Sequence, residues 1–191
     1  MFAVALWDAP RRRLVLARDR YGIKPLYYRE ENGGLEFASE LRSLPRGEID
    51  LDALEAFLAF NSIPAPLTIF TEARKLPPGT LAVWVDGELS QRRYARPAPV
   101  EAGEARRRPE AALAEELRET LRDSVRAHLV ADVPVGVLLS GGVDSAGLVA
   151  LAAGEQAEPV KTFSVGFEEA SFDELERARL VAKRYGAEHH E

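Results

Sequence analysis

The sequence predicts two fold classes in one chain of 191 residues: an α+β region built on an antiparallel sheet, then an α/β region built on a parallel sheet. In the first region, short β-rich runs alternate with turn residues, as is typical of hairpins. In the second region, nearly continuous apolar strands alternate with helices, which predicts parallel strands covered by helices on both faces. We place the first region at residues 1–95, a linker at 96–109 and the second region at 110–191.

Hairpins account for most of the first region. Each joins two β-rich runs across a turn, and Asn32–Gly34 and Asp86–Gly87 tolerate the positive φ that tight turns require. The expected strand pairs are 2–7 with 14–17, 25–29 with 35–38, and 81–85 with 89–94. Between the second and third pairs, Asp52 and Glu55 resemble a capping box that opens a short helix ending before Pro64.

The linker and the helix after it differ in pattern. Residues 95–109 contain three prolines, a glycine and three consecutive arginines, with no apolar periodicity. A solvated linker fits this composition better than an RNA contact, because the chain as a whole is acidic. From residue 110 to 129 the apolar residues recur every four positions, which predicts a helix. Pairs of opposite charge, Glu115 with Arg118 and Glu119 with Arg122, support this helix.

Composition excludes several classes of function. The chain has 25 Lys and Arg against 31 Asp and Glu, a net charge of −6, which disfavours nucleic acid and anionic membranes as partners. It has no cysteine, so disulfides, cysteine-bound zinc and a cysteine nucleophile on this chain are excluded. No apolar run approaches the ~20 residues that span a bilayer, and no signal peptide opens the sequence. We expect a cytoplasmic protein with a small-molecule or protein partner.

A glycine-rich loop carries the clearest chemical signal. It lies between an apolar strand expected at 133–139 and a helix expected at 146–153, ahead of a second strand at 160–166 and a second helix at 172–185. Glycines allow backbone N–H groups to face an anion, and the helix N-terminus adds partial positive charge, so the loop suits a phosphate. The loop consists of Ser140, Gly141, Gly142, Val143, Asp144 and Ser145.

Several groups of this loop can contribute to nucleotide binding. Ser140 and Ser145 can donate hydroxyl hydrogen bonds, and Asp144 can reach a Mg²⁺ ion that bridges phosphate oxygens. The loop lacks the lysine of the Walker motif and the spacing of the Rossmann motif. A plain strand-to-helix turn with a Ser or Asp cap is the alternative interpretation. It is weakened because all six loop residues fit the motif described next, in a strand–loop–helix context.

The loop matches the SGGxDS loop of the PP-loop ATP pyrophosphatases. Two upstream segments, 18–28 and 37–44, look like the RDxxGxxPLYY and ASExxAL segments of class II glutamine amidotransferases. Together with segments 162–167, 172–174 and 189–191, they make the chain resemble the glutamine-hydrolysing asparagine synthetase family over nearly its full length. The resemblance implies part of an antiparallel N-terminal-nucleophile amidotransferase sheet, followed by part of a PP-loop ATP pyrophosphatase domain of the adenine nucleotide α-hydrolase type.

The resemblance also implies a reaction. ATP is cleaved between its α- and β-phosphates to form β-aspartyl-AMP and pyrophosphate over Mg²⁺, and ammonia released from glutamine then displaces AMP to give asparagine. Loop residues 140–145 would bind ATP and pyrophosphate, with Asp144 as the Mg²⁺ ligand. Leu139 and Val165 would contact the adenosine portion of ATP. The family further suggests a homodimer, whereas Arg18-Asp19, Ser39-Glu40 and His189–Glu191 receive structural roles only.

The chain also departs from the family pattern. The family's glutaminase nucleophile is a mature N-terminal cysteine, and this chain has none. We therefore expect a fragment whose Met1 is an internal methionine and whose synthetase domain continues beyond Glu191, and which alone is inactive. A β-lactam-synthetase-like enzyme or another PP-loop amide-forming ligase is a second interpretation. A non-catalytic interaction module or a truncated gene product is a third.

Overall fold

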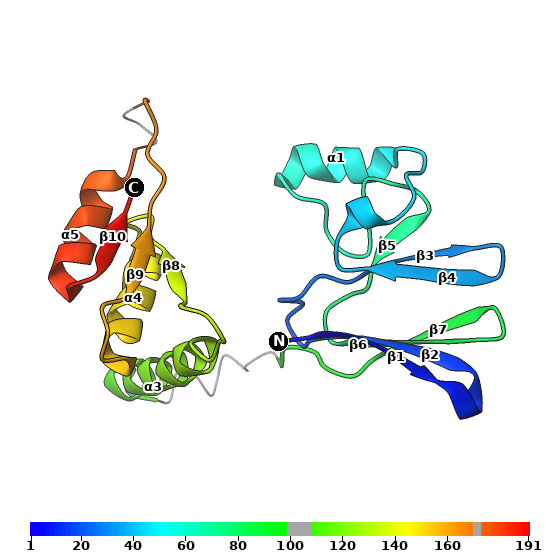
Figure 1. Cartoon of the computed structure of the whole chain (residues 1–191), viewed down its shortest axis with the longest axis horizontal. Helices are drawn as coiled ribbons and strands as arrows, with labels where there is room; N and C mark the ends of the chain where they lie inside the picture. The colour runs from blue at the N-terminus through cyan, green and yellow to red at the C-terminus, as the bar shows by residue number, and fades with distance from the viewer. Residues whose placement is uncertain (99–107, 170–172) are drawn as a thin grey trace. The chain divides into compact units, whose positions relative to one another are not determined.

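The computed structural model describes residues 1–98, 108–169 and 173–191, which fall into two compact units, Met1–Pro99 and Val100–Glu191 (Figure 1). Most of the linker predicted at 96–109 lies outside the described residues, so its conformation stays a prediction. Within the described part of the chain, no helix is long and apolar enough to cross a bilayer.

A four-stranded antiparallel sheet opens the first unit. Its order is β1-β2-β6-β7, and two of the three predicted hairpins, β1–β2 and β6–β7, are confirmed here. Asp86 and Gly87 take φ values of 49° and 91° in the β6–β7 turn, which is the positive φ that such turns require. The strands are β1 (Ala3–Asp8), β2 (Arg13–Arg18), β6 (Thr80–Val85) and β7 (Glu88–Arg93).

A second, three-stranded sheet of order β4-β3-β5 completes the strands of this unit. The predicted β3–β4 hairpin is confirmed, with positive φ at Asn32 and Gly33. The sequence did not predict β5, nor the division of the strands between two sheets. The strands are β3 (Tyr27–Glu31), β4 (Gly34–Ala38) and β5 (Ala73–Lys75).

The helix of this unit, α1 (Leu51–Phe60), begins earlier than predicted. Asp50, rather than Asp52, is the N-cap, because its extended backbone lets its carboxylate accept from the N–H of Ala53 at 3.1 Å. Asp52 lies inside the first turn instead. The helix ends at Phe60, and its C-cap, Asn61, takes a left-handed conformation before Pro64.

The core of the first unit joins both sheets. Leu16 of β2 and Ala82 of β6 face each other in register and are fully buried. Tyr28 of β3 packs into the same cluster, so the two sheets share one apolar core. The remaining buried members are Leu26 and Leu76.

The segment between β2 and β3 is organised by a buried carboxylate. Asp19 is only 3% exposed, and both of its carboxylate oxygens accept hydrogen bonds from backbone N–H groups. The donors are Phe2, Tyr21, Ile23 and Lys24, at 3.3, 3.1, 3.0 and 2.9 Å. Burial by itself raises the pKa of Asp19, but these bonds outweigh it and lower the pKa to about 2.

The neighbouring Arg18 closes the same segment from outside. Its guanidinium donates to the carbonyl oxygens of Gly22, Lys24 and Leu76, at 2.8, 2.9 and 2.7 Å. Arg18 and Asp19 therefore have the structural role that the sequence predicted, and together they fix the path of the chain from β2 to β3.

We expect Asp19→Asn to destabilise the first unit by about 2 kcal/mol, because an amide N–H₂ would face backbone donors that lose their acceptor. The pKa of Asp19 is lower in the folded than in the unfolded chain. Its stabilisation is therefore full above about pH 4 and is lost as the pH falls toward about 2. Urea unfolding followed by tryptophan fluorescence at several pH values measures both effects, since Trp7 and Trp84 lie in this unit.

The matched control for this prediction is Asp86→Asn, an exposed turn position at positive φ where asparagine is equally suitable. Equal unfolding midpoints for Asp19→Asn and the control would contradict the role given to Asp19.

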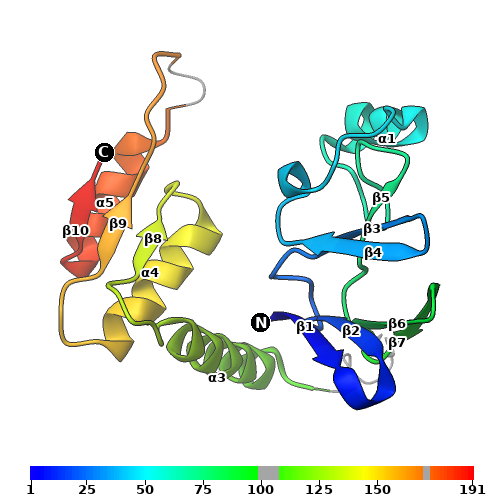
Figure 2. The same ribbon diagram turned by 45° about the vertical axis from the view of Figure 1, so that its right-hand side comes forward.

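The described residues of the second unit form a parallel sheet of order β10-β9-β8 with three α-helices, so the predicted change of fold class is confirmed (Figure 2). The strands are shorter than the apolar runs suggested. The helix at 110–129 is confirmed, and its Glu115–Arg118 and Glu119–Arg122 pairs form. The elements are α3 (Glu110–His128), β8 (Gly136–Leu138), α4 (Val143–Glu155), β9 (Lys161–Phe163), α5 (Leu175–Tyr185) and β10 (Glu188–His190).

The two faces of this sheet differ in their exposure to solvent. One row across the strands, Val137, Thr162 and His189, is inward, and Thr162 Oγ1 lies 2.9 Å from His189 Nδ1. The next row, Leu138, Phe163 and His190, is exposed, and the rings of Phe163 and His190 stack there. The expectation of helices on both faces was therefore wrong for the described residues, where α4 and α5 pack on one face around Leu139, Val149, Ala178 and Ala182.

Candidate functional site

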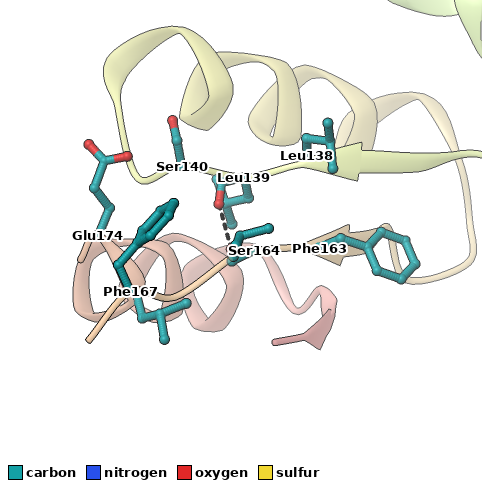
Figure 3. Close-up of a pocket in the computed structure, with 9 residues that line it drawn as sticks. Leu138, Leu139, Ser140, Phe163, Ser164, Phe167 and Glu174 are labelled. Carbon is teal, nitrogen blue, oxygen red and sulfur yellow. Dashed lines mark hydrogen bonds between the residues drawn. The ribbon is translucent and has the colours of Figure 1, made fainter. Parts of the chain in front are cut away.

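An open pocket of about 330 Å³ lies at the carboxyl ends of β8 and β9 (Figure 3). Ligands bind at this edge of open α/β sheets, because the loops that leave the strands meet there. Leu139 and Val165, which the sequence placed at the ends of neighbouring strands, both line the pocket. The other lining residues are Leu138, Ser140, Phe163, Ser164, Phe167, Glu174 and Leu175.

The glycine loop begins where β8 ends. Leu139 is 2% exposed, and its N–H donates to the carbonyl of Phe163 at 2.8 Å, which joins the two strand ends. Gly141 then takes a φ of +74°, a conformation that favours glycine. Gly142 is the N-cap of α4, so the helix begins at Val143, three residues earlier than predicted. Residues 143–145 therefore form the first turn of the helix.

The two loop serines face each other. Ser140 Oγ lies 3.0 Å from Ser145 Oγ, and the N–H of Ser140 donates to Ser145 Oγ at 3.2 Å. Ser145 Oγ in turn donates to the carbonyl of Gly142 at 3.2 Å. Gly142 has no side chain with which to cap α4, so the partial positive charge of this helix end faces the loop without a capping side chain.

Asp144 lies in the first turn of α4 and is exposed. Within the ranges that the structure describes, no three His, Asp or Glu side chains gather as a metal site. Mg²⁺ is commonly held by one or two carboxylates, substrate phosphates and water. The exposed carboxylate of Asp144, beside the glycine loop, is compatible with that pattern of coordination.

The loop rests directly on the first turn of α5. A Cβ at Gly141 would lie 2.6 Å from the Cβ of Arg177 and 2.9 Å from the backbone nitrogen of Ala178. A Cβ at Gly166, in the segment after β9, would lie 2.6 Å from Leu175 Cδ1. The sequence did not predict a role in the site for α5, although residues 172–174 belong to the segments that carry the family resemblance.

Ser164 connects the strand ends at the floor of the pocket. Its hydroxyl donates to the carbonyl of Leu139 at 2.5 Å (Figure 3), and its N–H donates to the carbonyl of His190 at 2.9 Å. One residue thus bridges the ends of β8, β9 and β10. Val165 follows it and is 72% exposed.

Two family models match this chain. The model described as Glutamine amidotransferase domain matches residues 1–95, and the model described as Asparagine synthase matches residues 116–191. The first match falls in the unit with antiparallel sheets, and the second falls in the unit that holds the pocket.

Similar proteins match most or nearly all of the chain. Asparagine synthetase [glutamine-hydrolyzing] 1 of Bacillus subtilis is 39% identical over 98% of this chain and 30% of its own length. Asparagine synthetase [glutamine-hydrolyzing] 3 of the same organism is 32% identical over 88% of the chain and 28% of its own length. Amidase chry2 of Gibberella zeae is 32% identical over 99% of the chain and 31% of its own length. The chain therefore spans only about 30% of the length of these relatives.

We expect Gly141→Ala to destabilise the second unit by roughly 1–3 kcal/mol, because a Cβ would be strained at positive φ and would clash with the α5 backbone. Gly147→Ala is the matched control. Gly147 lies in α4 with open space around its Cα, so alanine there should stabilise the helix by about 0.5–1 kcal/mol. Urea unfolding followed by far-UV circular dichroism distinguishes the two, since three of the four described α-helices belong to this unit. A Gly141→Ala chain as stable as the control would contradict the close contact.

Proposed function

Because the chain belongs to the glutamine-hydrolysing asparagine synthetase family, we propose that its second unit binds ATP with Mg²⁺ for the activation of a carboxylate, and that the whole protein makes asparagine from aspartate with glutamine as nitrogen donor. One observation carries this proposal. The SGGVDS loop leaves a buried strand end, opens an uncapped helix and borders an apolar pocket.

The loop would hold the phosphates of ATP. At Gly141 and Gly142 no Cβ stands between a phosphate and the backbone N–H groups, and the N-terminus of α4 favours negative charge. The hydroxyls of Ser140 and Ser145, which now bond to each other, can turn to donate to phosphate oxygens. Asp144 would hold Mg²⁺, which supplies positive charge to the phosphates when bound.

The pocket would hold the nucleoside. Leu139 and Val165 both line the pocket; Val165 is largely exposed, whereas Leu139 is buried at the end of its strand. A cavity of about 330 Å³ lined mainly by apolar side chains suits a purine base and its ribose.

Carboxylate activation explains why such a site is needed. A free carboxylate is a poor electrophile, so an oxygen of the carboxylate attacks the α-phosphorus of ATP and pyrophosphate leaves. Ammonia then attacks the acyl carbon, a proton is lost and AMP leaves with the electron pair of the broken C–O bond, which yields the amide. Donors around the pyrophosphate stabilise the charge that develops during the first step. The chain contains no cysteine, so it supplies no thiol for glutamine hydrolysis.

A second candidate is an amide-forming ligase with another acceptor carboxylate. Amidase chry2 shows that a protein of a different name aligns with 99% of this chain. The loop and the pocket would bind ATP, but their residues do not specify which carboxylate is activated. A screen of carboxylic acids for hydroxylamine-trapped acyl products, with aspartate as reference, discriminates the two candidates.

We expect Asp144→Ala to weaken binding of ATP in excess Mg²⁺ by about tenfold or more, because the ion loses its protein ligand. Without Mg²⁺, in the presence of a chelator, the variant should bind ATP at least as well as the unsubstituted chain, since a negative charge near the phosphates is gone. Isothermal titration calorimetry with the 191-residue chain measures both. Asp132→Ala, an exposed aspartate that does not line the pocket, is the control. Equal Mg²⁺-dependence of the two variants would remove Asp144 from this role.

A further inference from the structure

The pocket has one charged side chain. Among its lining residues, six are apolar, two are serines, and only Glu174 carries a charge. Figure 3 shows Glu174 beside Phe167, with its carboxylate on the side of the pocket where the Ser140 loop lies. A carboxylate is unexpected beside a site that binds phosphate, because the two negative charges repel each other. We therefore expect this carboxylate to bind another group of the ligand.

The position of Glu174 is fixed by its neighbours. It immediately precedes α5, and the first turn of that helix is held by two glycines that leave no space for a Cβ. Gly141 packs on the backbone of Ala178, and Gly166 packs on Leu175. Side chains on such a rigid element can be placed accurately against a ligand.

Glu174 has no structural task that would explain its identity. It is the N-cap residue of α5, but its side chain makes no capping hydrogen bond. The N–H of Leu175 donates instead to Asp173 Oδ1, at 3.4 Å. Within the described ranges, the carboxylate of Glu174 has neither a hydrogen bond nor an ion pair, and it is exposed to solvent.

The ribose of ATP, which lies between the base and the phosphates, offers a suitable partner for this carboxylate. With phosphates at loop 140–145 and the base against Leu139 and Val165, the ribose that joins them would occupy the same pocket that Glu174 lines. A carboxylate has two acceptor oxygens and no donor, and a vicinal diol offers two donors at matching separation. We propose that Glu174 accepts hydrogen bonds from the ribose 2′- and 3′-hydroxyls and thereby selects ribonucleotides over deoxyribonucleotides, an inference that rests on the proposed ATP site.

The test combines a change in the protein with a change in the nucleotide. Isothermal titration calorimetry of the 191-residue chain with Mg²⁺ and ATP, 2′-deoxyATP or 3′-deoxyATP gives the affinity ratio of ATP to each deoxynucleotide. We expect a ratio of about ten for the unsubstituted chain, as for loss of a hydrogen bond to a charged group. In Glu174→Ala the ratio should fall to about one, while the affinity for the deoxynucleotides stays nearly unchanged. Glu174→Gln, which keeps one acceptor oxygen, should lie between them.

Glu176→Ala is the matched control, since Glu176 lies in the first turn of the same helix, is exposed and does not line the pocket. It removes the same charge and should keep the ratio of the unsubstituted chain. Circular dichroism of each variant establishes that α5 is intact.

Three outcomes would overturn the proposal. The first is a ratio near one in the unsubstituted chain, and the second is the same ratio in Glu174→Ala as in the unsubstituted chain. The third is tighter ATP binding by Glu174→Ala, which would mean that the carboxylate only repels the phosphates. In each case ATP still binds, and the proposed function stands without this inference. If the folded, unsubstituted chain shows no saturable binding of ATP, the proposed function and the inference both fail.

Discussion

Close packing between the glycine loop and the first turn of α5 is the constraint on which the candidate site depends. Because backbone atoms meet where a Cβ would lie, neither segment can shift without moving the other. Gly141 directly precedes the cap of α4, so the same contact also sets where that helix begins. The glycine loop, the pocket wall and the start of two helices therefore form one rigid arrangement, although they come from separate parts of the sequence.

In each unit, one polar side chain holds the segment that follows a strand by forming hydrogen bonds with backbone groups. In the second unit Ser164 donates to the carbonyl of Leu139. In the first unit Asp19 accepts from four backbone N–H groups. A carboxylate is the stronger choice where several donors converge, because its charge strengthens each bond and its burial is then tolerated. A hydroxyl suffices where one carbonyl needs a donor.

Local sequence predicted the parts of the fold that local forces determine. Asn32 and Asp86 mark hairpins because their turns require positive φ, whatever the rest of the chain does. Strand β5 was missed because its three residues become a strand only by pairing with β3. The cap at Asp50 was assigned to Asp52 because both are aspartates, and only backbone geometry separates them. The glycine loop was predicted since its residues are consecutive, whereas Ser164 and Glu174 reach the pocket only through the tertiary fold.

The hydrogen bond between Ser140 and Ser145 would affect the energetics of the anion binding that we propose for the loop. In the free protein these hydroxyls already satisfy each other and a backbone N–H, so an arriving oxyanion exchanges hydrogen bonds more than it adds them. The heat released on binding would then come chiefly from charge and from the helix end rather than from the serines. Neutral or weakly charged oxygen ligands would gain little from such an exchange, so a loop with this hydrogen bond would favour highly charged anions.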